Sequence, residues 1–413
     1  MTRLSPTDHS FLTYQAAHPG VSVEIGQILL FGGRPPSVGE LRAHLAPRLD
    51  LLPALRRTPP ARVALVRRPR WAGDRPIDLV RHVRERRVET GALHAAVDEV
   101  LNRPLPDDAP LWELWLLHGY DDDEFAVFYK AHHPLHDGVS LVDVAEAMFA
   151  HDPAFPHGSA AGRLPLRRVL RGLASLTAGC ARIASSTPLH VPASGRRRLV
   201  WCSVPMAWLQ DARRAGGSTI NDVYLAALAG AVRHWSRGAI RRLQVLVPVS
   251  TRTVAERGTL GNRLAALRVL LPCEEIEAAE RLSAVTQATR RAKERGEATA
   301  AAWLTQAGRL LPAAATRGLA ELSLHPRLTN LMASNIPGPR GRLTLAGRPL
   351  QTIIGVNFLP RHHGASVMLM SHRDRVVVSF HGDAALPGLD DLPRLWLASL
   401  REPAGQLVDV AKR

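Results

Sequence analysis

The chain contains, in unbroken order, the run Phe125-Ala126-Val127-Phe128-Tyr129-Lys130-Ala131, the segment His132-His133-Pro134-Leu135-His136-Asp137-Gly138, and an apolar stretch from Val139 to Ala150. The first run predicts a strand and the last predicts a helix. The seven residues between them follow the pattern HHxxxDG and therefore stand at a strand-to-helix corner. Corners of this kind often carry chemistry.

The adjacent histidines are candidate bases. An imidazole has an unperturbed pKa of about 6.5, so one of the pair can be neutral near pH 7 and accept a proton. We expect Asp137 to be buried at the turn, where its charge needs a partner such as an arginine, and Gly138 to permit a tight backbone. The alternative is an ordinary loop with two solvated histidines and an Asp-Gly turn.

We expect no metal at this corner. The histidines are not accompanied by a second cluster of histidine, cysteine or carboxylate residues with ligand spacing. The three cysteines, Cys180, Cys202 and Cys273, are scattered along the chain, which fits a reducing compartment. Nothing in their local sequence marks one of them as a nucleophile.

Other short motifs accompany the histidines in a fixed order. Before them come Leu4-Ser5-Pro6-Thr7-Asp8-His9-Ser10-Phe11-Leu12, then Trp71, Asp74, Ile77-Asp78-Leu79 and His82-Val83, then Pro110-Leu111-Trp112-Glu113. After them come Asn221-Asp222, Val247-Pro248-Val249-Ser250-Thr251-Arg252, Gly261-Asn262 and Ser334-Asn335-Ile336-Pro337-Gly338-Pro339. In this order the motifs resemble the bacterial wax ester synthase/diacylglycerol acyltransferase family. That family lies within the CoA-dependent acyltransferase superfamily, together with chloramphenicol acetyltransferase and the condensation domains of peptide synthetases.

The resemblance covers the chain from about residue 3 to residue 400. It implies an α/β fold in which two α+β sandwich lobes, each similar to chloramphenicol acetyltransferase, hold the active site in a tunnel between them. It also implies that His133 is the catalytic base, which takes the proton of an alcohol while the oxygen attacks the thioester of acyl-CoA. Acyl-CoA is then a co-substrate, no cofactor stays bound, and the acceptor is a lipophilic alcohol such as a long-chain alcohol or diacylglycerol.

The resemblance further implies supporting roles for His132, Asp137, Gly138 and Asn335. His132 packs structurally in most members of the superfamily, and Asp137 holds the corner through an ion pair, for which we predict Arg252 as the partner. The backbone amides near Gly138 and the side chain of Asn335 are candidate donors to the tetrahedral oxyanion. Further substrate-binding or structural candidates are Pro110, Leu111, Trp112, His136, Asn221, Asp222, Arg252, Ser334 and Gly338.

Some of these candidates have a purely structural interpretation as well. Thr219 and Asp222 have the spacing of a capping box, so Asn221 and Asp222 can simply begin a helix. The segment 334–339 can be an ordinary turn at the end of a strand.

The chain also departs from the family pattern. The stretch between the histidines and Asn221 is shorter than usual, and Pro134 replaces a small residue. His136 adds a third imidazole that can pair with Asp137 or alter its environment. A His372-Arg373-Asp374 turn replaces the usual tyrosine-containing one, while Asp383 matches a later aspartate. These differences make the reaction type a safer prediction than the substrate.

Composition bears on the partners. The net charge is +16, but Lys130, Lys293 and Lys412 are the only lysines, and the arginines are spread along the chain. This distribution argues against nucleic-acid binding and is better suited to anionic lipid or to the phosphates of CoA. The sequence shows no signal core and no run of about 18 apolar residues, so we expect a cytoplasmic protein or one peripheral to membranes or lipid inclusions. Its oligomeric state is open.

The apolar patterns predict three parts: a lobe over residues 1–154, a crossover over 155–198 and a second lobe over 199–413. In the first lobe we expect strands near 21–31, 63–67, 112–118 and 124–132, and helices near 38–56, 77–88 and 91–102. In the second we expect strands near 199–204, 243–248, 265–271, 328–334, 352–356, 366–371 and 375–381, and helices near 219–237, 276–295, 300–311 and 389–400. A basic amphipathic stretch around Leu166 to Leu176 is either a membrane contact or a face packed on the protein itself.

Three functions fit these observations. The first is an acyl-CoA:alcohol O-acyltransferase that makes wax ester or triacylglycerol. The second is a condensation-like acyltransferase of secondary metabolism that acylates an alcohol or amine from CoA or a carrier protein. The third is a relative that binds lipid or a partner without catalysis.

Overall fold

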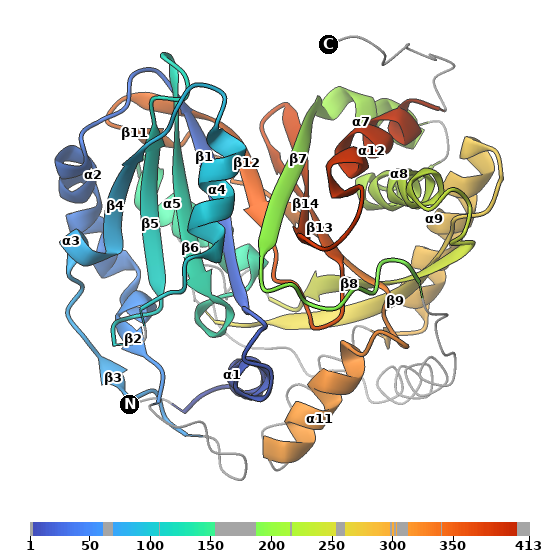
Figure 1. Ribbon diagram of the computed structural model, residues 1–413, viewed down its shortest axis with the longest axis horizontal. Coiled ribbons are helices and arrows are strands. Elements are labelled where there is room, and N and C mark those ends of the chain that lie inside the picture. The colour runs from blue at the N-terminus through green and yellow to red at the C-terminus, as the bar shows by residue number, and fades with distance from the viewer. Residues whose placement is uncertain are drawn as a thin grey trace.

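Two six-stranded mixed sheets, each covered by helices, stand side by side (Figure 1). The structure is a computed structural model, and it describes residues 3–60, 69–106, 108–152, 187–214, 217–252, 261–297, 313–339 and 341–402, with the single residues 300 and 303. The expected two-lobed α/β fold is confirmed. The predicted strand at 63–67 and the amphipathic stretch at 166–176 lie outside the described residues, as does nearly all of the predicted helix at 300–311.

The first sheet has the order β11-β12-β1-β6-β5-β4. Its strands are β11 (Thr344–Leu345), β12 (Arg348–Val356), β1 (Glu24–Gly32), β6 (Glu124–His132), β5 (Trp112–His118) and β4 (Val83–Arg87). The helices α2 (Val38–Leu45) and α5 (Gly138–Phe149) pack with it in one core, while α4 (Leu93–Asn102) packs in a separate cluster against β5 and β7. The remaining short elements of this part are α3 (Leu79–His82), the 3-10 helices at Ala46–Leu51 and Pro53–Arg56, and a small pair of strands, β2 (Arg57–Thr58) and β3 (Gly73–Asp74).

The second sheet has the order β7-β14-β13-β10-β8-β9. Its strands are β7 (Arg197–Pro205), β14 (Arg375–Asp383), β13 (Ala365–His372), β10 (Leu331–Pro337), β8 (Arg242–Ser250) and β9 (Leu264–Pro272). One core joins this sheet to the helices α7 (Met206–Arg214), α8 (Ile220–Trp235), α9 (Ala278–Glu294) and α12 (Leu392–Arg401), with a 3-10 turn at Leu389–Asp391 before α12.

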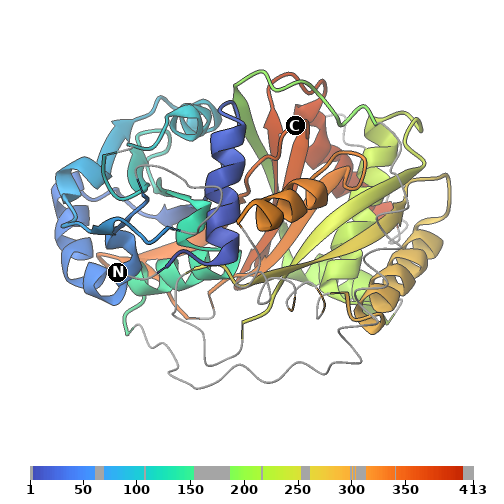
Figure 2. The same ribbon diagram turned by 90° about the horizontal axis from the view of Figure 1, so that it is seen from below.

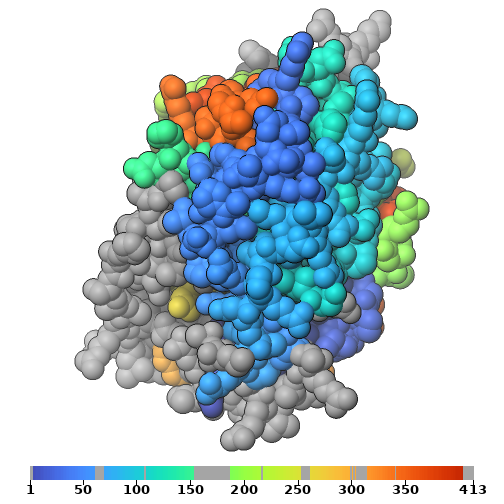
Figure 3. Space-filling view, turned by 90° about the vertical axis from the view of Figure 1, so that its left-hand side faces the viewer, coloured from blue at the N-terminus to red at the C-terminus, as the bar shows by residue number. Residues whose placement is uncertain are grey.

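The β11–β12 segment comes from the second half of the chain but belongs to the first sheet. β12 runs antiparallel to β1, with Gly26 opposite Val356. Figure 3 shows the orange atoms of this segment on the face of the first lobe, beside the blue atoms of the N-terminal residues. The range 199–413, predicted as the second lobe, therefore includes two strands of the first sheet, β11 and β12. Local patterns could not reveal this, because pairing between strands more than 300 residues apart leaves no mark in either strand.

Two helices cross the seam between the lobes: α1 (Pro6–Ala17) and α11 (Ala313–Ser323). They contact each other, and Figure 2 shows them side by side between the two halves of the molecule. Helix α1 begins at a capping box, in which the Ser5 hydroxyl accepts the Asp8 amide and the Asp8 carboxylate accepts the Ser5 amide. Neither helix was predicted.

Two predicted helices differ from the observed structure. The predicted helix at 38–56 ends at Leu45 and continues as two 3-10 turns, since Pro47 and Pro53 lack the amide that an α-helix needs. The predicted helix at 77–88 is wrong for its second half, where Val83–Arg87 form β4, parallel to β5. Pairing with a buried neighbour outweighed the weak helical pattern of these charged residues.

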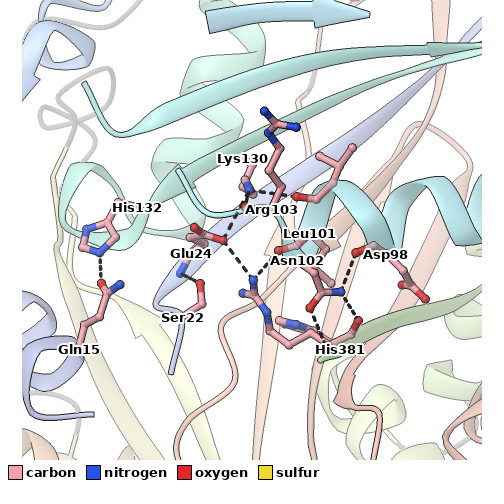
Figure 4. A network of polar contacts seen from close by, with 12 residues as sticks. Gln15, Ser22, Glu24, Asp98, Leu101, Asn102, Arg103, Lys130, His132 and His381 are labelled. Atoms are coloured by element: carbon pink, nitrogen blue, oxygen red, sulfur yellow. Dashed lines mark hydrogen bonds and ion pairs between the residues drawn. The ribbon is translucent and has the colours of Figure 1, made fainter. Parts of the chain in front are cut away.

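A buried polar network close to His132 ties the lobes together (Figure 4). Glu24, which lies opposite His132 in the β1–β6 pair, receives Lys130 at 3.7 Å and Arg197 of β7 at 3.4 Å. Asn102 of α4 exchanges two hydrogen bonds of 2.8 Å with the backbone of Arg197. Because both cations share one carboxylate, removing Glu24 would leave buried charge without compensation.

None of the helices in the described part of the chain has the length and apolar content needed to span a bilayer.

Candidate active site

The histidine corner forms where β6 ends. His132 is the last residue of β6, His133 to Leu135 form a single 3-10 turn, and Gly138 begins α5. Asp137 is the N-cap of α5, and its carboxylate accepts the Ser140 amide at 2.9 Å. The predicted strand, corner and helix are therefore confirmed, and all three histidines are buried. The alternative of a solvated loop is wrong.

Asp137 is completely buried and forms the predicted ion pair. Its carboxylate lies 3.2 Å from the Arg252 guanidinium, whose side chain is 3% exposed, and it also accepts the Arg263 amide at 2.8 Å. Burial alone would raise the pKa of the Asp137 carboxyl, but the Arg252 charge and the amides of Arg263 and Ser140 hold this pKa below its usual value. Arg252 and Arg263 belong to the second lobe, so this ion pair also fastens the lobes together.

The His133 imidazole lies between aromatic rings. Phe11 of α1 stacks on it with ring centroids 3.9 Å apart, and Phe358 meets it edge-on at 5.5 Å. Burial lowers the pKa of the His133 imidazole to about 4, with a partial opposing effect from its own carbonyl group and from Asp137. At neutral pH the ring is therefore uncharged, which is the protonation state that a general base needs.

Asn262 joins three segments at this point. Its Nδ2 donates to the His133 carbonyl oxygen at 2.8 Å and to Oδ1 of Asp8 at 2.9 Å. All three residues are buried. They come from the first lobe, from the loop before β9 in the second lobe, and from α1. His133 is thus held from both lobes and from the helix that bridges them.

The other two histidines have partners away from the reaction centre. His132 donates from Nε2 to the Gln15 side-chain oxygen. His136 hydrogen-bonds through Nε2 with the Tyr129 hydroxyl at 2.9 Å. The expectation that His136 pairs with Asp137 is therefore not met, since the Asp137 carboxylate is taken by Arg252, Ser140 and Arg263. Burial lowers the pKa of both His132 and His136 to about 3.

A cavity of about 1010 Å³ opens beside His133, between the lobes. It lies where the second sheet splays, because β10 and β8 pair only at Leu331–Val245 and Met332–Leu246. Helices α1 and α11 contribute to its wall, as do residues of β8, β9 and β10. Most of its described lining is apolar, and no described aspartate or glutamate takes part. The volume is at the upper end of the range of about 300–1,000 Å³ that is usual for ligand pockets.

Besides His133 and Gly138, three predicted candidates lie on this wall: Asn335, Ser334 and Asn221. Asn335 of β10 donates to the Asn221 side-chain oxygen at 3.4 Å, and Ser334 accepts from Asn357, which also lines the cavity, at 3.1 Å. Asp222 is not part of the described lining. It closes the capping box of α8 with Thr219 and accepts the Thr289 hydroxyl at 2.6 Å, so the helix-start interpretation holds for this residue.

The two predicted glycines are closely packed, and the backbone contact makes Gly338 the stricter case. Gly138 borders the cavity, and a Cβ there would stand 2.1 Å from Cδ1 of Ile336. A Cβ on Gly338 would stand 1.9 Å from the Ser371 carbonyl oxygen, which is backbone and cannot yield. The structure thus corrects the reason we gave for Gly138, since its φ is not in the left-handed region and the limiting factor is the Ile336 side chain.

Pro110, Leu111 and Trp112 are outside the described lining and have structural contacts. The Leu111 carbonyl accepts the His132 amide at 3.0 Å, and the Trp112 indole donates to the Leu55 carbonyl at 3.1 Å. The Trp112 carbonyl accepts from the His82 ring at 2.8 Å. The segment therefore sets the position of β5 beside the end of β6, one residue before His133.

Four residues of the site were not predicted: Asp8, Phe11, Asn262 and Asn357. The first three lie within motifs that resemble the family, but nothing in their local sequence assigns them to the environment of His133. Asp8 and Phe11 come from α1, Asn262 lies just before β9, and Asn357 lies just after β12. Only the tertiary packing of these segments brings the four residues together.

The described residues offer neither a metal centre nor a reactive thiol at the cavity. No three histidine, cysteine, aspartate or glutamate side chains among them form a group that could hold a metal ion. Burial raises the pKa of the Cys202 and Cys273 thiols to about 12, and neither residue is part of the described lining. His133, whose imidazole is neutral at pH 7, is a histidine of the described lining.

Two lobes with a buried HHxxxDG corner at their seam define the two-lobed acyltransferases related to the condensation domains. The first condensation domain of the calcium-dependent antibiotic synthetase shares this fold, with a TM-score of 0.67 at 18% identity over 97% of this chain and 95% of that one. Residues 4–168 match the wax ester synthase/diacylglycerol acyltransferase catalytic domain, and residues 260–402 match the C-terminal domain of the same family. The chain belongs to this wax ester synthase/diacylglycerol acyltransferase family, and it is an acyltransferase.

Individual relatives agree. A probable diacylglycerol O-acyltransferase of Mycobacterium tuberculosis is 26% identical over 100% of this chain and 97% of its own length. A putative diacylglycerol O-acyltransferase of Mycobacterium bovis is 29% identical over 74% of this chain and 71% of its own length. The wax ester synthase/diacylglycerol acyltransferase of Marinobacter aquaeolei VT8 superimposes with a TM-score of 0.73 at 25% identity, covering 97% of this chain and 98% of that one.

The buried histidines make stability depend on pH. Burial lowers the pKa of His132, His136 and His381 to about 3 and that of His133 and His363 to about 4. In the unfolded chain these groups titrate near 6.5, so between about pH 6.5 and pH 4 the unfolded state binds more protons than the folded state. The free energy of unfolding must therefore fall as the pH is lowered through this window. We expect Tm to drop by roughly 5–10 °C between pH 7.5 and pH 5.5, as measured by circular dichroism. A Tm that stays constant would show that these rings are protonated in the folded protein.

Proposed function

We propose that the protein is an acyl-CoA-dependent O-acyltransferase that esterifies a long-chain alcohol or diacylglycerol, with His133 as the general base. The observation that carries this proposal is the neutral imidazole at the wall of a large, mainly apolar cavity. Such a cavity favours an acyl chain and a lipophilic acceptor over a polar one, because most of its described lining is apolar.

The reaction follows from the contacts of His133. The imidazole accepts the proton of the acceptor hydroxyl as its oxygen attacks the thioester carbonyl, and the tetrahedral intermediate then expels the CoA thiol, which regains a proton from the imidazolium. Because burial lowers the pKa of His133 to about 4, its imidazolium is a stronger acid than an exposed one and returns the proton readily. Asn335 is the polar side chain on the cavity wall that we assign to the oxyanion.

Peripheral contact with a membrane or a lipid inclusion is part of this proposal, as the source of the acceptor. Leu319 and Leu322 of α11 support it, because both line the cavity and are also exposed, at 42% and 48%. A lipophilic molecule could therefore pass from a lipid phase into the cavity along an apolar surface.

The proposal is tested by product analysis. Purified protein is incubated with radiolabelled palmitoyl-CoA and, in separate reactions, with hexadecanol, diacylglycerol, a short polar alcohol or a primary amine. We expect labelled wax ester or triacylglycerol as the main product. An exclusive product from the amine or the short polar alcohol would instead support a condensation-like acyltransferase. The absence of any product would contradict the proposed activity.

The cavity should also select for chain length. Ala266 of β9 lines the cavity, and a phenylalanine at this position would fill part of its volume. We expect Ala266→Phe to lower kcat/KM for palmitoyl-CoA by about tenfold while kcat/KM for butyryl-CoA changes less than about twofold. A matched control is Leu270→Phe, farther along the same strand at an exposed position outside the described lining. An equal loss with both donors would mean that the variant damages the fold and not the acyl site.

A further inference from the structure

Two basic side chains lie on the mainly apolar wall of the cavity: Arg268 of β9 and Lys293 of α9. The described lining contains no aspartate or glutamate that could neutralise them. Arg268 is half-buried, and its buried Nε has no hydrogen-bond partner among the described residues. A charged donor that is buried without a partner costs free energy, so this group requires an explanation.

Arg268 differs from the other arginines whose Nε is buried and unpaired. Several of these hold a carboxylate through another nitrogen of the same guanidinium group: Arg56 holds Asp50, Arg252 holds Asp137 and Arg281 holds Glu402. Within the described part of the chain, no such bond is found for Arg268. Its guanidinium group is therefore available to an anion that enters the cavity.

Lys293 supplies the second cation from the helix that packs on β9. It is exposed and also lines the cavity, so it lies where the cavity meets solvent. The carboxylate next to it in sequence, Glu294, is taken by Arg290 at 2.8 Å. Figure 1 shows α9 on the side of the second lobe that faces away from the first lobe.

The register of β9 places Arg268 at a distance from the reaction centre. Asn262, just before β9, holds the His133 carbonyl at 2.8 Å. Leu264, Ala266 and Arg268 alternate along the strand and therefore share a face, and all three line the cavity. At about 3.3 Å per residue, Arg268 stands roughly 13 Å along β9 from Leu264. A group bound by Arg268 thus belongs to a remote part of a substrate.

The chemistry of the two cations indicates which group this is. An acyl chain and a long-chain alcohol have nothing to offer a guanidinium or an ammonium group. A phosphate ester offers negative charge and several acceptor oxygens, which suit the planar fork of an arginine and the point charge of a lysine. Acyl-CoA carries phosphates that the pantetheine arm separates from the thioester, and an anionic lipid acceptor carries one in its headgroup.

We propose that Arg268 and Lys293 form a phosphate-binding subsite of the cavity, separate from the place of acyl transfer at His133. The two residues bind substrate and take no part in proton transfer. The inference rests on the proposed function for the choice of substrates. The binding of a phosphate-bearing ligand is measured without turnover.

The test compares ligands with and without phosphate by isothermal titration calorimetry. One pair is CoA and pantetheine, and the other is lysophosphatidate and monoacylglycerol. We expect the wild type to bind the phosphate-bearing member of at least one pair about tenfold more tightly than its phosphate-free partner. The pair that shows this difference identifies the source of the phosphate.

Two variants and a control assign the difference to the subsite. Arg268→Gln should raise Kd for the phosphate-bearing ligand about tenfold, and Lys293→Gln about threefold because its exposed charge is screened by solvent. Both should leave Kd for the phosphate-free ligand within about twofold of the wild type. Arg295→Gln is the matched control, since it removes the same charge two residues after Lys293 at an exposed position outside the described lining. Its Kd values should equal those of the wild type.

Three results would overturn the proposal: no preference of the wild type for phosphate, unchanged Kd values in both variants, or an equal loss in Arg295→Gln. The last would mean a general attraction to a basic protein. Circular dichroism checks the fold of each variant, and the exposed Lys293 provides the test if Arg268→Gln does not fold. If the phosphate preference is found but no acyl group is transferred, the proposed function fails and the subsite stands. Acyl transfer without the preference would refute the subsite alone.

Discussion

His133→Ala is expected to lower kcat for ester formation by about 10²–10⁴-fold, the range usual for removal of a general base. The imidazole is buried against Phe11 and Phe358 and is neutral near pH 7, with a pKa of about 4. Without it, the acceptor hydroxyl must lose its proton to water, a much weaker base. The measurement is the steady-state rate with palmitoyl-CoA and the acceptor that proves best.

The matched control for this variant is His132→Ala. His132 is the neighbouring buried ring, but its Nε2 is engaged by Gln15 and it is outside the described lining of the cavity. We expect His132→Ala to lower kcat by less than about tenfold. Its loss of unfolding free energy should be similar to that of His133→Ala, since each substitution leaves a void beside buried groups. If His132→Ala lost as much activity as His133→Ala, or more, the assignment of the base would be wrong.

Asp137→Ala is expected to destabilise the protein by about 3–5 kcal/mol, because it leaves the buried Arg252 guanidinium without its carboxylate. The same change removes the N-cap of α5 and the acceptor of the Arg263 amide. The corner would then lose its link to the second lobe, so kcat should fall as well. Urea unfolding followed by circular dichroism measures the stability, and the acyltransferase assay measures the activity.

Two further variants separate charge from shape at this position. Asp137→Asn keeps the size of the side chain and can still cap α5. Any loss of stability that it shows is therefore due to the missing ion pair. Asp222→Asn is the control, because Asp222 is also a buried carboxylate in the first turn of a helix, where it contacts the neutral side chains of Thr219 and Thr289. We expect Asp222→Asn to cost no more than about 1–2 kcal/mol and to leave kcat nearly unchanged. Equal stability of Asp137→Asn and the wild type would contradict a stabilising ion pair.

The corner was predictable because its signals are local. Strand β6, the turn and helix α5 follow from apolar patterns, and the need for a partner of Asp137 follows from the cost of burying a charge. The identity of that partner as Arg252 came from the family resemblance, and the ion pair of 3.2 Å agrees with it. Trp112 and Asp222, by contrast, shape the fold beside the site and are not part of the described cavity wall.

What could not be predicted depends on contacts between distant segments. Strand β12 completes the first sheet, and its pairing with β1 shows no local pattern that distinguishes it from the neighbouring strands of the second sheet. Asp8 and Asn262 are 254 positions apart and meet at 2.9 Å only because α1 lies across the seam between the lobes. Of the two alternatives for His136, pairing with Asp137 is not found, because its Nε2 hydrogen-bonds with Tyr129. Asp137 still acts on His136 through its charge, which opposes the lowering of the His136 pKa by burial.

We propose that the acyl group passes directly from the thioester to the alcohol, with the neutral His133 imidazole as base. A single-turnover experiment with excess enzyme, radiolabelled palmitoyl-CoA and the preferred acceptor, quenched in acid, follows the label in CoA ester, product and protein. We expect label to move from palmitoyl-CoA to the product ester with no labelled protein at any time. The rate should change little between pH 7.5 and pH 6, since the pKa of His133 is about 4. Label that accumulates on the protein, or a rate that falls in proportion to a group titrating near pH 6.5, would contradict it.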